Sequence, residues 1–366
     1  MKRIYFILVI VTLITQIIQA QVNYVRVWTA TAPEQNPNVL VTRPLIDVKQ
    51  VTQYFDGIGR QVQTVAKQAS LPAAATAGND LVTLQGYDAY NRPNMQYLPY
   101  VANGTDGSYQ ADAFTAQPAY YNSSSSPIAG QGEAGSNAHS LTTYEPSPLN
   151  RTALSMAAGN SWVGSNRGVA TQYSANTTTD SVKLFTVTDN GLGSWGSYTM
   201  VGAYATGSLY KTITTDENGK QVIEFKDLAG RVILKKVQHT AANDNGMGAG
   251  YSGWLCTYYI YDDFNNLRCV IQPAGVQQLI NQNWSFITNV FFEQCFRYEY
   301  DRRNRMVMKK VPGAAVVYMV YNSKDLLVMT QDANMRTNGK WMATVYDTLN
   351  RPMKTGLLSN TNSLVT

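Results

Sequence analysis

The chain has 366 residues, enough for two domains or for one extended repeat body. Only 14% of the residues are charged, the formal net charge is +5, and Tyr, Thr, Ser, Asn and Gly are abundant. This composition is typical of an extracellular β-rich protein and argues against a helical cytosolic enzyme. The positive charge forms no dense Lys/Arg cluster within a recognised binding module, so we expect no nucleic-acid partner.

The N-terminus carries an export signal. Lys2 and Arg3 precede the apolar run "IYFILVIVTLITQIIQA", which ends at the small residue Ala20. This pattern predicts a secretory signal peptide over residues 1–20. An uncleaved anchor is the alternative, because Ile18 is large for its place before the cleavage site. No later stretch of the sequence is long and apolar enough to span a membrane, so we expect a secreted or cell-surface protein that leaves the membrane after signal cleavage.

The rest of the chain divides into two regions. Residues 21–160 are predicted to form an N-terminal domain, and residues 161–366 an array of hairpins. The stretch "YYNSSSSPIAGQGEAGSNAHS" lacks periodicity, which predicts a flexible loop near residues 119–141. One helix is predicted at "PAGVQQLINQNW", residues 273–284, because its apolar residues recur at helical spacing and would pack on a sheet.

A turn with a clear mechanism lies in "YEYDRRNRMVMKKVPG", residues 298–313. The Asp301 side chain, first in a type I turn, accepts a backbone N–H from two residues further on. Asn304 tolerates the left-handed conformation that closes a three-residue hairpin loop. Asp301 then lies opposite Arg305, and the two flanking strands pair.

This register predicts the cross-strand pairs Tyr300–Met306, Glu299–Val307 and Tyr298–Met308. The two tyrosines and the two methionines would share one apolar face, with Glu299 and Lys309 on the other. A two-stranded ribbon cannot bury such a face alone, so the hairpin needs neighbours.

The same turn pattern, an Asp, two free positions, a Gly or Asn and usually an Arg, recurs along the chain. Related turns are "TDENGK" at Asp216 and a degenerate copy, "VYNSKDLLVM", at Asn322 and Asp325. The irregular spacing suits stacked hairpins with insertions. We therefore predict a mainly β fold, an array of β-hairpin repeats with one short inserted helix. The predicted structural turn residues are Asp56, Gly59, Arg60, Asp88, Asn91, Arg92, Asp227, Gly230, Arg231, Asp262, Asn265, Asp301, Asn304, Arg305, Asp347, Asn350 and Arg351.

These strings resemble the YD repeats of the RHS family, large bacterial surface and toxin-delivery proteins whose hairpins spiral into a hollow β-shell. Blocks such as "QYFDGIGRQVQTVAKQAS", "GYDAYNRPNMQYLPYVA" and "YEPSPLNR" resemble the uncharacterised N-terminal domain that precedes the repeats in secreted Bacteroidetes RHS proteins. The resemblance covers most of the chain after residue 50. The RHS core with its autoproteolytic site and a C-terminal toxin region are both absent from the sequence, which suggests a fragment or a truncated copy.

The sequence offers few residues that could form a catalytic site. The only histidines are His139 and His239, and neither has the spacing of a zinc site or of a nucleophile–base pair. The notable aspartates are already used by turns. We therefore predict no catalytic, cofactor-binding or metal-binding residues and no cofactor, with weak calcium binding at the Asp/Asn-rich turn tips left open.

The chain has three cysteines, Cys256, Cys269 and Cys295, so at least one thiol stays free. The hairpin register places Cys269 opposite Tyr259 and Cys256 on the other face. A Cys256–Cys269 disulfide is left open.

Three functions remain. The resemblance favours a non-catalytic scaffold, part of a shell that encloses or presents a C-terminal toxin or effector, whose partners would be the missing core and toxin segment or neighbouring repeats. The alternative is an extracellular module whose exposed aromatic residues bind carbohydrate, such as surface glycans, or protein. An enzyme is the least favoured function. An in-frame continuation of the gene into a core segment would support the scaffold.

Overall fold

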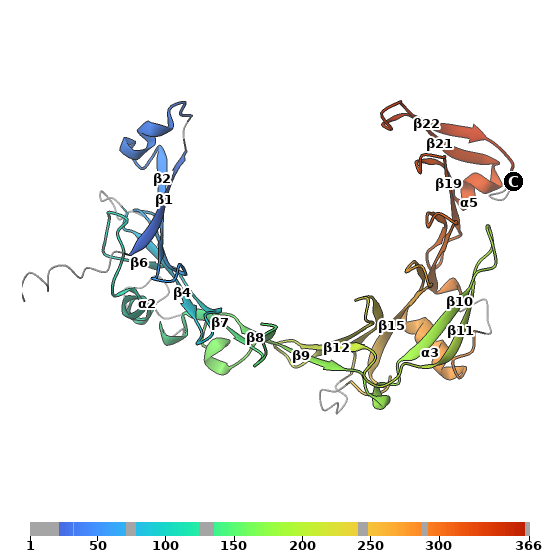
Figure 1. The fold of residues 1–366 in the computed structure, drawn as a ribbon, viewed down its shortest axis with the longest axis horizontal. Helices are drawn as coiled ribbons and strands as arrows, with labels where there is room; N and C mark the ends of the chain where they lie inside the picture. Colours follow the sequence, from blue (N-terminus) through green and yellow to red (C-terminus); the bar gives the residue numbers. More distant parts are fainter. Residues whose placement is uncertain are drawn as a thin grey trace, which may run out of the picture. The chain divides into compact units, whose positions relative to one another are not determined.

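The computed structural model describes residues 22–31, 33–70, 78–123, 135–240, 248–286 and 292–362. The predicted signal peptide, residues 1–20, lies outside the described residues. The chain divides into two compact units, of which the first ends at Ala170 and the second begins at Thr171. The domain boundary predicted from the sequence lies after residue 160. Figure 1 labels their elements. Both units consist mainly of antiparallel strands, which confirms the predicted mainly β fold.

The first unit is a series of short antiparallel strands. Strands β1 to β4 pair in chain order, β4 also pairs with β5 and β6, and β5 continues through β7 to β8. The strands are β1 (Asn23–Ala30), β2 (Val48–Phe55), β3 (Gln61–Ala66), β4 (Leu81–Tyr87), β5 (Pro93–Tyr97), β6 (Tyr100–Val101), β7 (His139–Tyr144) and β8 (Thr152–Met156). Strand β9 (Val169–Ala175) begins at the end of this unit and continues into the second. The helices are α2 (Ala113–Asn122) and the short 3-10 turns η1 (Pro37–Thr42), η2 (Gly135–Asn137) and η3 (Val163–Ser165).

Helix α2 was not predicted. It occupies the start of the stretch near 119–141 that the sequence predicts as a loop, and β7 occupies its end; residues 124–134 lie outside the described residues. The helix contains Pro118 and has no apolar stripe, so its sequence carries little helical signal. Two kinds of contact hold it. Ala113, Ala116, Tyr120 and Tyr121 pack in the hydrophobic cluster of the first unit, and the buried Gln117 side chain donates to the carbonyl oxygens of Ala138 (2.8 Å) and Leu98 (3.2 Å).

The second unit is a meander in which each strand from β12 to β22 pairs with the next. A separate two-stranded sheet is formed by β10 and β11. The strands are β10 (Lys183–Thr188), β11 (Ser197–Ala203), β12 (Tyr210–Thr215), β13 (Gln221–Lys226), β14 (Val232–Gln238), β15 (Trp254–Tyr261), β16 (Leu267–Ile271), β17 (Cys295–Tyr300), β18 (Met306–Lys310), β19 (Val317–Tyr321), β20 (Leu327–Gln331), β21 (Lys340–Tyr346) and β22 (Pro352–Ser359). The helices are α3 (Pro273–Asn281), α5 (Ala333–Thr337) and the 3-10 turn η4 (Thr178–Asp180).

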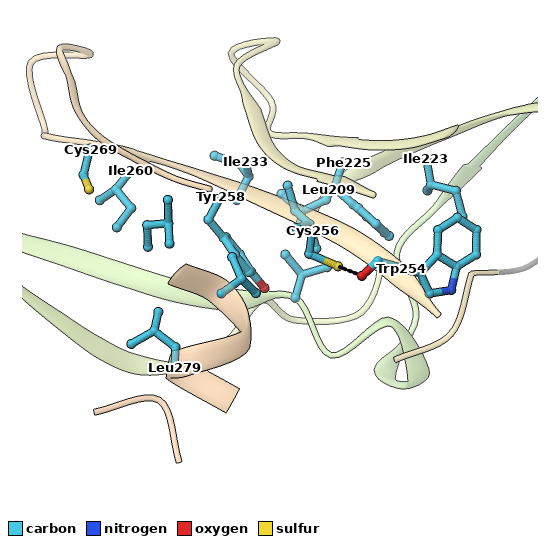
Figure 2. Packing of buried hydrophobic residues seen from close by; sticks show 14 of the residues in the cluster. Leu209, Ile223, Phe225, Ile233, Trp254, Cys256, Tyr258, Ile260, Cys269 and Leu279 are labelled. Atoms are coloured by element: carbon cyan, nitrogen blue, oxygen red, sulfur yellow. Dashed lines mark hydrogen bonds between the residues drawn. The ribbon is translucent and has the colours of Figure 1, made fainter. Parts of the chain in front are cut away.

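The core of the second unit lies where α3 and β10 pack against β15. The predicted helix is present as α3, which ends before Trp284; the Trp284 ring packs against Tyr251, 5.1 Å between centroids. Figure 2 shows Tyr258 and Ile260 of β15 in this cluster with Leu279 of α3. Helix α5 was not predicted and is stabilised by an N-cap, the side chain of Asp332 accepting the Met335 N–H at 2.8 Å.

A β-bulge lies next to each of the turns at Asp56, Asp88, Asp227, Asp262, Asp301 and Asp347. It shifts the pairing of the two strands away from the predicted register. Tyr300 pairs with Met306 as predicted, but beyond it Glu299 pairs with Met308 and Tyr298 with Lys309. The predicted pairs Glu299–Val307 and Tyr298–Met308 are therefore wrong. The extra residue leaves two successive residues, Val307 and Met308, buried.

Because of the bulge, Met308 shares a face with Glu299, and Lys309 shares a face with Tyr298, so the predicted faces are wrong for these two residues of β18. Glu299 is buried at 3% exposure and accepts a hydrogen bond from the Gly196 backbone N–H at 2.8 Å, besides its contact with Arg268. Its neighbour on the same face, Arg297, is buried between the rings of Trp195 and Phe292, each 4.3 Å away. Charged side chains with partners thus occupy the buried face.

All three cysteines lie within the described residues; none of them is in a disulfide, and all are buried. Because of the bulge in the β15–β16 hairpin, Cys269 pairs with Ile260 and not with Tyr259. Cys256 lies on the buried face of β15, and its Sγ lies 3.9 Å from the carbonyl oxygen of Trp254 (Figure 2). The prediction that it points to the opposite face from Cys269 is wrong, and the Cys256–Cys269 disulfide left open by the sequence is not formed.

Candidate functional site

The turn at Asp227 shows how each repeat closes. The backbone N–H of Asp227 donates to the Arg231 carbonyl (3.0 Å), and that of Gly230 donates to the Asp227 carbonyl (2.9 Å). The Asp227 carboxylate accepts from the backbone N–H groups of Ala229 (3.0 Å) and Arg231 (2.9 Å) and from the Arg231 Nε (2.7 Å). Three hydrogen bonds to one carboxylate make the turn self-contained.

The other predicted turns share this geometry. The Arg Nε to Asp Oδ2 distance is again 2.7 Å for Asp56–Arg60, Asp88–Arg92, Asp301–Arg305 and Asp347–Arg351. The fourth turn residue is left-handed in every case. Gly or Asn occupies it at Gly59, Asn91, Gly230, Asn265, Asn304 and Asn350, with φ between 59° and 84°, and Asp325 occupies it in the degenerate copy at Asn322, with φ 63°. The predicted turn residues are thus brought together turn by turn.

The turn at Asp262 departs from the pattern. Asn266 takes the Arg position, and its amide donates to Asp262 Oδ2 at 3.1 Å. Arg268, two residues later, supplies the missing guanidinium at 3.2 Å. Asp262 therefore keeps a cationic partner although the motif lacks its Arg.

These contacts shift the titration of the turn carboxylates. The pKa of Asp56 is lowered, first by the backbone N–H of Arg60, against an opposing effect of burial, and then by the Arg60 side chain. The pKa of Asp347 is lowered in the same way by the backbone and side chain of Arg351. Asp56 and Asp347 accordingly close their turns as ionised carboxylates at neutral pH.

The Arg side chain also reaches the next hairpin. Arg60 Nη1 donates to Asn91 Oδ1 at 2.6 Å, and Arg231 Nη1 donates to Asn265 Oδ1 at 2.6 Å. The acceptor is in each case the left-handed residue of the following turn. Further links of this kind run from Arg92 to Asn150 (3.3 Å), from Asn266 to Asn304 (3.2 Å) and from Arg305 to Asp325 (2.8 Å).

The Tyr of each Tyr–Asp pair faces backward onto the previous hairpin. The Arg60 guanidinium lies 4.7 Å from the Tyr87 ring centroid, and that of Arg231 lies 4.9 Å from the Tyr261 ring. The Tyr87 hydroxyl donates to the carbonyl of Gln61, the residue after Arg60, at 2.9 Å. Equivalent hydroxyl contacts are Tyr144 to Pro93 (2.7 Å), Tyr300 to Leu267 (3.1 Å) and Tyr346 to Leu327 (2.8 Å).

We call this series of contacts the turn ladder: the Asp–Arg pair of one turn, the Arg link to the left-handed residue of the next turn, and the Tyr packed between them. The ladder runs through the first unit from Arg60 to Asn150 and through the second from Arg231 to Asp325. Each linking Arg (Arg60, Arg92, Arg231 and Arg305) thus has one contact within its own hairpin and one with the next hairpin.

Sequence reasoning assigned these residues to their own turns and missed the links. It also missed one member of the ladder, the longer turn from Glu145 to Arg151, in which Arg151 Nε lies 2.5 Å from Glu145 Oε1 and Asn150 is left-handed at φ 54°. The "YEPSPLNR" string contains the signal, a Tyr followed by an acidic residue and a closing Asn–Arg, but its loop is longer than the motif allows.

The described residues hold little other chemistry. No group of three or more His, Cys, Asp or Glu is arranged to hold a metal ion within the described ranges. Within the same ranges, no helix is both long enough and apolar enough to cross a membrane. His139 lies in β7 against the Tyr97 ring, 5.3 Å between centroids, and burial lowers its pKa.

Comparisons with known proteins agree with this architecture. Residues 26–175 match a family model described as a domain of unknown function, DUF6443. The chain is similar to the structure of the Photorhabdus luminescens Tc holotoxin pore with the mutation TccC3-D651A, at 14% identity and a TM-score of 0.52, covering 93% of this chain and 14% of that one. The crystal structure of TcdB2-TccC3-Cdc42 is similar at 17% identity and a TM-score of 0.50, covering 85% of this chain and 13% of that one.

None of the curated protein sequences matches the chain. The chain spans about one seventh of the length of the toxin chains it matches. At these identities the likeness concerns the fold: a mainly antiparallel β architecture similar to RHS and Tc toxin shell folds.

Proposed function

We propose that the chain is a non-catalytic structural segment of an exported RHS-type protein, a stretch of β-shell wall. The turn ladder is the observation that carries this proposal. It uses the charged and aromatic motif residues to join hairpin to hairpin, which is the requirement of a wall built from units that cannot bury their faces alone. The similarity in fold to Tc toxin structures supports the same conclusion.

The full-length protein would enclose or present a toxin or effector at its C-terminal side. The similar structures are those of a Tc holotoxin pore and of TcdB2-TccC3-Cdc42, and they support the proposal of a cargo-bearing shell. The partners of this segment would then be neighbouring repeats, an RHS core and the cargo. No catalytic role is assigned, because the turn aspartates already accept two backbone N–H groups and an Arg side chain.

The test is electron microscopy of the protein encoded by the whole reading frame, combined with limited proteolysis. We expect a hollow particle in which the C-terminal segment resists protease. In a double variant, Arg60→Ala with Arg231→Ala, the C-terminal segment should lose this protection. An Arg351→Ala variant is the matched control. A frame that ends without further repeats, or a solid particle with an exposed C-terminal segment, would overturn the shell.

Export is proposed from the N-terminal sequence and is tested separately. Expression in a bacterial host with a secretory pathway should release a form that begins near Gln21 in the periplasm or medium. A cytoplasmic protein that retains Met1 would contradict export and leave the ladder untouched.

A further inference from the structure

The first unit contains a groove next to the ladder, lined in part by the ladder residues Arg60, Tyr87 and Asp88. It has a volume of about 520 Å³ and lies beside β4, β5 and the start of α2. Its lining includes Gln85 and Tyr87 of β4, Tyr97 of β5 and Phe114 of α2. Pockets for small molecules span roughly 300–1,000 Å³, and this groove falls within that range.

Two aromatic rings are presented at one end of the groove. Tyr97 and Phe114 meet edge to face, with centroids 5.6 Å apart and an interplanar angle of 81°. Tyr97 is held from another side by the His139 ring. Phe114 is 44% exposed and lies outside the buried core of the unit, so its ring offers an apolar face to solvent. A large aromatic residue in this position contributes little to folding.

The charges in the groove are already compensated. Arg60 pairs with Asp56 and donates to Asn91, and Asp88 pairs with Arg92 at 2.7 Å. An ionic ligand would have to compete with these contacts. The groove therefore suits a neutral ligand.

Two neutral polar groups lie beside the rings. Among the described residues, the Tyr97 hydroxyl makes a single hydrogen-bond contact, to the thioether Sδ of Met95 at 3.6 Å, and a thioether is a weak acceptor. The Gln85 amide nitrogen donates to the carbonyl oxygens of Gly86 (2.9 Å) and Met95 (2.8 Å), which fixes the side chain and leaves its amide oxygen as an acceptor. A hydroxyl and an oriented amide oxygen match the hydroxyl groups of a ligand.

We propose that this groove binds a neutral hexopyranose unit of a glycan. The C–H face of the sugar ring would pack on Phe114 and Tyr97, and sugar hydroxyls would bond the Tyr97 hydroxyl and the Gln85 amide oxygen. A pyranose is uncharged and has an apolar face with polar edges, which is the combination that the groove presents. The residues that would contact the sugar, Phe114, Tyr97 and Gln85, make none of the ladder links.

The test is affinity electrophoresis and calorimetry of the full chain with a panel of neutral oligosaccharides and polysaccharides of glucose, mannose and galactose. We expect binding to at least one probe, weakened at least tenfold by Phe114→Ala and by Gln85→Ala. Tyr90→Ala is the matched control: Tyr90 is an aromatic residue of the same unit, 79% exposed at a turn tip outside the groove, and its loss should leave binding unchanged.

Circular dichroism and hydrogen exchange establish that each variant is folded. The proposal is overturned if no neutral probe binds the folded chain, or if binding survives Phe114→Ala and Gln85→Ala. Binding of a proline-rich peptide in the groove without binding of any sugar would also overturn it, since such peptides use aromatic grooves too. None of these results bears on the shell, which depends on the ladder.

Discussion

Replacing Arg231 by Ala is the sharpest perturbation of the ladder. The change removes the 2.7 Å bond to Asp227, the 2.6 Å bond to Asn265 and the stacking on Tyr261. The side chain is 29% exposed, so solvent screens part of the charge. The two hydrogen bonds then contribute about 1 kcal/mol together and the stacking about 0.5–1 kcal/mol, which gives a local cost of about 2 kcal/mol.

The control is Arg351→Ala. Arg351 makes the same 2.7 Å contact with its own turn aspartate, but its side chain is 72% exposed and, among the described residues, it has no bond to another hairpin. Loss of an exposed pair costs about 0.5 kcal/mol. The two variants therefore separate the link between hairpins from closure of the turn.

Hydrogen exchange followed by mass spectrometry measures both effects locally, which suits a repeat protein that need not unfold in one step. Peptides covering β13 to β16 should exchange about 30-fold faster in Arg231→Ala, since 1.4 kcal/mol is a factor of ten. Peptides covering β21 and β22 should change by about twofold in Arg351→Ala. Equal changes in the two variants would show that the link to Asn265 contributes nothing, and the reasoning would be refuted.

Three further outcomes are expected. Gly230→Val should destabilise its hairpin by about 1–3 kcal/mol in the same exchange assay, because Gly230 has a φ of 80° that a β-branched residue resists, whereas Gly230→Asn should be tolerated; unchanged protection in the Val variant would contradict the turn geometry. The pKa of turn carboxylates such as Asp56 is lowered in the folded state. The stability that this shift contributes is present above the ordinary pKa of 3.8 and is lost as the pH falls through the folded pKa. The thermal unfolding midpoint should therefore decrease below about pH 4, and it should decrease less in an Asp56→Asn variant. Burial raises the pKa of Cys256 to about 11 and that of Cys269 well above its ordinary value. The thiols should therefore react with a thiol reagent only after unfolding, and three thiols should then be counted. Rapid reaction of the folded protein would contradict their burial, and fewer than three thiols in denaturant would contradict the absence of a disulfide.

The mainly β fold and the positions of the turns are local properties, and for that reason they were accessible from the sequence. A left-handed residue at the fourth turn position needs Gly or Asn, so Gly59, Asn91 and Asn304 identify their turns wherever they occur. Helix α3 was accessible because its apolar residues recur at helical spacing.

The bulges, helix α2 and the ladder links depend on contacts distant in sequence. The bulge at Val307 carries no residue signature, yet it moves Met308 and Lys309 to the faces of the hairpin opposite to those predicted. Arg297 and Glu299 are buried because Trp195 and Gly196, about 100 positions earlier, supply their partners. The chain alone does not indicate such pairs. The recurrence of Arg and Tyr did signal a common role, and the structure adds that the role lies between hairpins.

The most direct test of the ladder is a double-mutant cycle on Arg60 and Asn91 in the first unit. Arg60→Ala removes the guanidinium, and Asn91→Gly removes the amide while keeping a residue that accepts the φ of 65°. Hydrogen exchange of β3 to β5 in the two single variants and the double variant yields the coupling free energy. A coupling of about 0.5–1.5 kcal/mol is predicted from one charge-assisted hydrogen bond that is partly exposed. Strictly additive effects would mean that Arg60 and Asn91 act only within their own turns, and the account of a wall joined turn to turn would be contradicted.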